Sequence, residues 1–110
     1  MPQLDVPALL QDMLKAAQGA LTTEWPAAHD YAAKEFPKLL LEAEHVTRMR
    51  AEGVITDEQA ALLMDMQCNA SRAVLLAVKG MGLVAAQAAL AAALGAVRTA
   101  VNTALGFAIL

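Results

Sequence analysis

The acidic residues of this chain are confined to its first half, and this asymmetry limits the possible folds more than any other feature. All eleven carboxylate side chains lie between Asp5 and Asp65. The 44 residues from Gln67 to Leu110 hold no carboxylate side chain and only three bases. A helix that is apolar on every side must be covered by a core, by other chains or by lipid. The second half of the chain must therefore be buried in the protein's own core, against another chain or in lipid.

The composition excludes several classes of protein. A length of 110 residues suits one domain, so we expect residues 1–110 to form a single all-α domain. With 58% hydrophobic residues, the chain is too apolar for intrinsic disorder. The net charge of −3 argues against a nucleic-acid partner, because such binders usually carry a basic face. The sequence starts without the features of a secretory signal, so we expect a cytoplasmic location.

Apolar residues recur at helical spacing along the whole chain, and alternating β-branched runs are missing. The sequence therefore predicts an all-α fold. Short turns between the segments predict a compact up-and-down four-helix bundle with an alanine-rich, apolar C-terminal helix pair. The four expected helices are Val6–Leu21, Pro26–Ala51, Asp57–Lys79 and Leu83–Ala104.

Capping residues mark several of the expected helix ends. Thr56 and Gln59 have the spacing of a capping box, in which each side chain binds the backbone N–H of the other residue. Asp5 is the expected N-cap of the first helix. The segment Gly80–Gly82 should end the third helix, because two of its three residues are glycine.

The second helix carries mixed signals. Thr22 or Thr23 is the expected cap at its start, and Gly53 suits the position just after its end. Pro37 lies in its interior, where proline lacks a backbone N–H and its ring collides with the carbonyl four residues earlier. A kink or a break is therefore expected at Pro37.

One stripe of the second helix is the expected core face. A histidine in such a stripe is most often a neutral core residue with one hydrogen-bond partner, and this is the prediction for His29. The stripe consists of Trp25, His29, Ala32, Phe36, Leu39 and Ala43.

The C-terminal half offers apolar surface for association. Alanine accounts for 26 residues, concentrated in this half, and small side chains allow two helices to approach closely. One ridge consists of Ala88, Ala92, Ala96 and Ala100.

The third segment has apolar residues on two adjoining faces, so a single chain should leave part of them exposed. We therefore expect a homo-oligomer, or binding to an unidentified protein partner. The first face consists of Leu62, Leu63, Met66, Ala70, Ala73, Val74 and Ala77, and the second of Ala61, Met64, Cys68 and Leu75.

One short motif suggests a metal. Glu42 and His45 stand three residues apart, which puts a carboxylate and an imidazole on one helix face. At these two residues the chain resembles the ferritin-like family, whose di-iron sites combine such pairs with single glutamates. The resemblance implies an iron site at Glu42 and His45, with Glu35 or Glu24 as the bridging glutamate. A second copy of the chain would supply the other ligands.

The same helix face can also be read without a metal. In that interpretation Glu42 pairs with Lys38, Glu44 pairs with Arg48, and His45 lies on a solvated surface.

A membrane-associated protein is a further alternative. The 18 residues Gly80–Val97 carry no charge and reach the lower length limit of a spanning helix. Eight of these residues are alanine, and Gln87 lies near their middle. We therefore favour a core helix of a soluble oligomer over a membrane span.

Enzymatic chemistry finds little support in the sequence. Ser71 is the only serine, and it lacks the surroundings of a catalytic nucleophile. No glycine-rich phosphate loop follows a predicted strand. The sequence therefore predicts a non-enzymatic protein that associates through its apolar C-terminal half. Iron binding through Glu42 and His45, and association with a membrane, are the alternatives.

Overall fold

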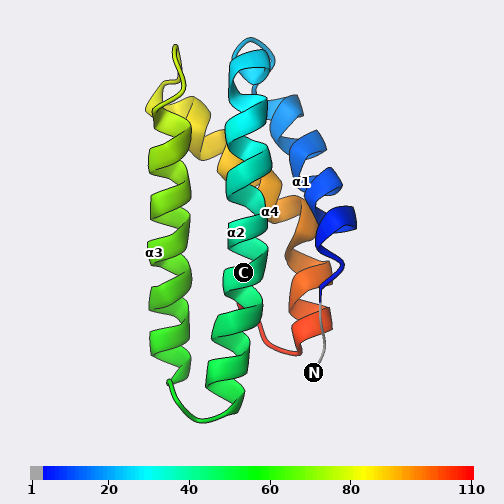
Figure 1. The fold of residues 1–110 in the computed structure, drawn as a ribbon, viewed down its shortest axis with the longest axis vertical. Coiled ribbons are helices and arrows are strands. Elements are labelled where there is room, and N and C mark those ends of the chain that lie inside the picture. The colour runs from blue at the N-terminus through cyan, green and yellow to red at the C-terminus, as the bar shows by residue number, and fades with distance from the viewer. Residues whose placement is uncertain (1–3) are drawn as a thin grey trace.

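The computed structural model describes residues 4–110, and this part of the chain contains helices and no strand. Successive helices run in alternating directions along the long axis, as the colours in Figure 1 show. The predicted all-α, up-and-down bundle is therefore confirmed. Its elements are α1 (Val6–Ala20), α2 (Trp25–Ala51), α3 (Asp57–Leu76) and α4 (Leu83–Leu105).

The four helices do not form a square. α2 lies between α3 and α1, and α4 crosses behind α2 from the end of α3 towards α1 (Figure 1). The largest helix–helix contacts join α1 to α4 and α2 to α3. α3 meets α4 less extensively and does not contact α1 within residues 4–110. As a result α3 forms one edge of the bundle, with a neighbour along only one side.

Local chemistry explains where α1 and α3 begin. The Asp5 carboxylate accepts a hydrogen bond from the Ala8 N–H at 3.3 Å. Thr56 Oγ1 accepts from the Gln59 N–H at 3.1 Å, and Gln59 Oε1 accepts from the Thr56 N–H at 2.8 Å. Both predicted caps are confirmed, because these oxygens bind N–H groups that lack a partner in the helix.

The start of α2 differs from the prediction. Neither Thr22 nor Thr23 is the cap; Glu24 occupies the N-cap position, without a side-chain cap bond. Pro26 lies in the first turn, where its fixed φ suits the helix and its missing N–H costs no intrahelical bond.

The helix continues through Pro37, so the predicted break does not occur. The neighbours Phe36, Leu39 and Leu40 are fully buried. Burial of three large side chains outweighs the cost of about 3 kcal/mol for an interior proline.

The end of α2 is a Schellman motif at the predicted glycine. Gly53 has a φ of 76°, in the left-handed region that glycine adopts without strain. Its N–H donates to the Arg50 carbonyl at 3.1 Å, and the Val54 N–H donates to the Met49 carbonyl at 3.0 Å. The chain then needs only a few residues to reach the cap of α3.

All four helices contribute to the hydrophobic core, but His29 is not part of it. The inward positions of α2 include Ala28, Ala32 and Phe36, so His29 lies one step round the helix from this stripe. Its ring is half-exposed, stands edge-on to Trp25 and has its Nδ1 3.3 Å from an Asp30 carboxylate oxygen. The predicted core histidine is therefore wrong, because the inward stripe is centred on the neighbouring residue.

The chain beyond α4 folds back along the helix. Asn102 Oδ1 accepts hydrogen bonds from the N–H groups of Ile109 and Leu110, both at 3.0 Å. The Arg50 guanidinium lies 3.8 Å from the centre of the Phe107 ring, and Arg50 Nε also donates to the Asp57 carboxylate. These contacts join the last residues to the ends of α2 and α3.

The capping box yields a prediction about stability. Thr56→Ala removes the side-chain acceptor at the start of α3 and should lower the free energy of unfolding by about 1 kcal/mol. Gln59→Glu is the matched control, because glutamate at this position can still accept from the Thr56 N–H. Urea unfolding followed by circular dichroism measures both variants. Equal losses of stability in the two variants would contradict this role of Thr56.

Candidate functional site

The solvent side of α3 carries a row of uncharged side chains, all apolar except Asn69. Residues facing the bundle, such as Met64 and Leu75, are buried. On the opposite side, Leu62 and Met66 keep 59% and 57% of their surface exposed. Their row follows steps of four and three residues, which keeps it on one side of the helix. We call this row the α3 outer face; it consists of Leu62, Met66, Asn69, Ala73 and Leu76.

The α3 outer face has the pattern of a helix that lacks its partner. Alternating steps of three and four residues are the spacing of a coiled-coil seam. Beside the row, Ala70 and Ala77 are also exposed. None of these side chains is charged. An exposed apolar row of this kind marks an interaction site more often than ordinary surface does.

Charged residues follow one flank of this face. Glu58, Asp65 and Arg72 are spaced by seven residues, so they share one side of α3. Arg72 Nη2 donates to Asn69 Oδ1 at 2.6 Å, and this bond holds the guanidinium beside the outer face. The acidic residues come first along the helix and the base follows.

α4 also has a bare side, with the large side chains of Leu83 and Val84 exposed at its start and smaller side chains beyond them. Of the alanine ridge noted in the sequence, Ala88, Ala96 and Ala100 are exposed and Ala92 is half-buried. The ridge therefore points mostly away from the chain's own core. Alanine buries little area, so the ridge beyond Leu83 and Val84 offers less apolar free energy than the α3 outer face does.

By length and composition, α4 could also cross a membrane. Its mean hydropathy is 1.5, and one third of its most apolar window is buried within the bundle. Core helices of soluble proteins can have the same length and composition, so these two properties alone are weak evidence for a span; the low burial of α4 leaves the membrane alternative open.

A buried polar cluster joins α2 to α3. The side chain of Glu35 is only 6% exposed. Lys38 Nζ donates to Glu35 Oε2 at 2.8 Å, and Ser71 Oγ donates to Glu35 Oε1 at 3.5 Å. Gln67 Nε2 in turn donates to Ser71 Oγ at 3.2 Å. Each oxygen of the buried carboxylate thus has a partner, as burial of a charge requires.

The residues predicted to bind iron are not gathered into a site by one chain. Glu42 is half-buried and His45 is exposed, while Glu35 is occupied by Lys38 and Ser71. Within residues 4–110, no three side chains among histidine, cysteine, aspartate and glutamate converge on one point. The prediction required a second copy for the other ligands, so the iron site at Glu42, His45 and Glu35 stays a prediction.

The expected surface ion pairs beside this motif differ in the structure. Lys38 pairs with Glu35 and not with Glu42. Glu44 Oε1 accepts a hydrogen bond from the Leu4 N–H at 2.7 Å, which ties the start of the chain to α2. Glu35 takes the lysine because its more deeply buried charge has more to gain from a cation than the half-buried Glu42 carboxylate has.

The single cysteine is poorly suited to chemistry. Burial raises the pKa of the Cys68 thiol, the nearby Asp65 charge raises this pKa further, and Arg72 lowers it in part. A raised pKa keeps the thiol protonated near neutral pH, and the thiolate is the reactive form. Cys68 therefore fits a structural role on α3.

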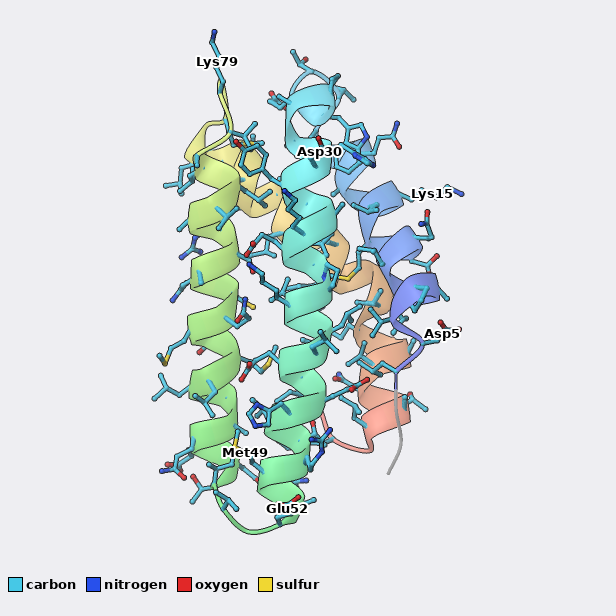
Figure 2. The ribbon with its side chains drawn as sticks, in the orientation of Figure 1. Asp5, Lys15, Asp30, Met49, Glu52 and Lys79 are labelled. Carbon is cyan, nitrogen blue, oxygen red and sulfur yellow. The ribbon has the colours of Figure 1, made fainter. Side chains whose placement is uncertain are left out.

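A depression that is open to solvent lies between α1 and the start of α2. Lys15, Trp25 and His29 lie along it. The labelled side chain of Lys15 points away from the bundle in Figure 2. The depression lacks the enclosed apolar walls of a typical ligand site.

Comparison with known proteins adds no family assignment. No protein-family model matches the chain, and no curated protein or solved structure matches it. The surfaces described above are therefore the basis for inferring what the protein does.

The polar cluster yields a second prediction about stability. Ser71→Ala removes one partner of the buried Glu35 carboxylate and should lower the free energy of unfolding by about 1–3 kcal/mol. Thr47→Val is the matched control, because the Thr47 hydroxyl is buried without a hydrogen-bond partner. This control should keep or gain stability. Chemical denaturation compares the two variants, and a loss confined to Thr47→Val would contradict the assignment.

Proposed function

We propose that this protein is a non-enzymatic self-association module whose C-terminal half binds another chain through the α3 outer face. The observation that carries the proposal is the exposure of Leu62 and Met66 in one uncharged row. α3 lies at the edge of the bundle, so another helix can reach this row without disturbing the core (Figure 1).

The energetic balance shows how much of the face is needed. Burial of a Leu or Met side chain contributes about 1.5–3 kcal/mol, and Leu62 and Met66 have somewhat more than half of their area left to bury. Two copies together therefore supply roughly 3.5–7 kcal/mol from these side chains. Association costs about 4–15 kcal/mol in lost freedom. Burial of both Leu62 and Met66 is thus required for a stable complex, and contacts of the neighbouring residues must supply the remaining free energy.

The membrane alternative depends on a different element. It uses the apolar length of α4, whereas self-association uses the side of α3 that faces solvent. Substitutions on α3 should leave lipid binding by α4 unchanged. The two hypotheses therefore predict different responses to the same variants.

The proposal predicts the oligomeric state of a double variant. Leu62→Glu with Met66→Glu places two charges in the α3 outer face and should convert a stable oligomer into an 11.5 kDa monomer. Light scattering in detergent-free buffer measures the mass, and circular dichroism checks that the helices are retained.

A matched control uses two other exposed apolar residues. Leu41 on α2 and Val54 after α2 are 54% and 65% exposed, so Leu41→Glu with Val54→Glu changes surface charge to the same extent. This control should remain an oligomer. A monomeric natural sequence, or equal dissociation of both variants, would refute the proposal. Recovery of the protein only from membranes would favour the α4 alternative.

A further inference from the structure

The α3 outer face changes in side-chain size along its length. Its first part carries the large residues Leu62 and Met66, and its second part carries exposed Ala73, flanked by Ala70 and Ala77. Leu76 ends the row and is less exposed than Leu62 or Met66. A helix running in the opposite direction with the same sequence would set Leu62 against the small Ala73 and Met66 against Asn69, so that the two large residues do not meet each other.

The charged flank changes in the same direction. Glu58 and Asp65 precede Arg72 at intervals of seven residues. Lys79 follows another seven residues on, in the turn after α3, and its side chain points away from the bundle (Figure 2). In two antiparallel helices, equal heptad positions on one flank face each other. In an antiparallel pair, the acidic residues of one α3 helix therefore face the basic residues of the other.

From these two gradients we infer that the partner is a second copy of this chain, and that the two α3 helices pair in antiparallel orientation about a two-fold axis. The inference depends on the proposed function, because it specifies the partner and geometry of the same surface. The axis passes between the levels of residues 67 and 68. Such a pair closes on itself, since both copies present the same face.

This axis fixes the contacts between the copies. Leu62 packs against Ala73 of the second copy, and Met66 packs against Asn69 of the second copy. Asp65 on the flank faces Arg72 of the second copy, and symmetry forms the same pair again. Exposed ion pairs contribute only about 0.2–1 kcal/mol each, so they select the orientation while the apolar row supplies the affinity.

A parallel pair fits these residues less well. Parallel helices would place the charged flank beside the opposite flank of the partner, where Leu63, Ala70 and Ala77 lie. The charges would then have apolar neighbours. Large side chains would also meet large ones at one end and small would meet small at the other, leaving poorer packing.

Cysteine cross-linking distinguishes the two orientations. In a Cys68→Ser background, Leu62→Cys and Ala73→Cys are made in separate chains. The antiparallel pair brings position 62 of one chain next to position 73 of the other. Position 62 of one chain and position 62 of the other are then offset by 11 residues, about 16 Å along the helix axis, and the same holds for position 73. A disulfide needs Cα atoms within about 7 Å. Only the mixture of the two chains should therefore form a covalent dimer under mild oxidation.

The other cross-linking results overturn the inference in distinguishable ways. A covalent dimer in each chain alone, and none between the two chains, establishes a parallel pair. No covalent dimer in any sample, with an oligomer that Leu62→Glu and Met66→Glu still abolish, leaves the proposed function intact and removes this geometry. If the natural protein is a monomer, both the proposed self-association and the antiparallel geometry are refuted.

Charge substitutions supply an independent readout that needs no cysteine. Asp65→Arg and Arg72→Asp each place like charges in both flank contacts, so each chain alone should self-associate about tenfold more weakly at low salt. Mixing the two chains restores both pairs, and hetero-association should return to the natural affinity. Sedimentation of the separate and mixed chains measures this. Failure of the mixture to recover, or recovery that does not weaken as salt is added, contradicts the antiparallel pairing.

Discussion

The packing of α4 onto α1 determines which surfaces of this bundle remain free. Because α4 turns away from α3 and crosses behind α2, α3 has α2 as its main neighbour (Figure 1). The first half of the chain thus covers one side of each C-terminal helix and leaves the other side bare. Because no carboxylate follows Asp65, the bare sides contain long apolar stretches with few charges, Arg98 being the exposed charge on α4. The arrangement of the four helices therefore leaves one side of α3 and one side of α4 without a helix packed against it.

A small polar cluster lies on the side of α3 that faces away from the bare one. In the observed rotation of α3 about its own axis, Ser71 faces the buried Glu35 carboxylate across 3.5 Å, on the same side of the helix as the buried Met64 and Leu75. Leu62 and Met66 lie on the side of the helix away from Ser71, so the same rotation turns them towards solvent. Only the Glu35 side of its ion pair with Lys38 is buried, and removal of a partner would leave this buried carboxylate uncompensated. The rotation of α3 that buries Ser71 thus also exposes Leu62 and Met66.

The sequence was sufficient to locate the helices, since caps and breakers such as Thr56 and Gly53 act through their own local bonds. It was not sufficient to fix the rotation of each helix. α3 is apolar on two faces, so periodicity alone did not show which face turns inward, and Ser71 was considered only as a nucleophile. His29 was misplaced for the same reason, by one position. The spacing of Gln67 and Ser71 on one side of α3 was the available signal for the polar cluster.

The order of helices along the chain has a consequence for biosynthesis. α1 emerges from the ribosome first, whereas the helix that covers it most extensively, α4, is made last. The α2–α3 hairpin, with its stop and start signals only a few residues apart, can form in the meantime because its contacts are local. The part of α1 that packs on α4 therefore stays exposed until α4 has been synthesised, although α2 can cover another part of α1 earlier, and such transiently exposed apolar surface favours aggregation.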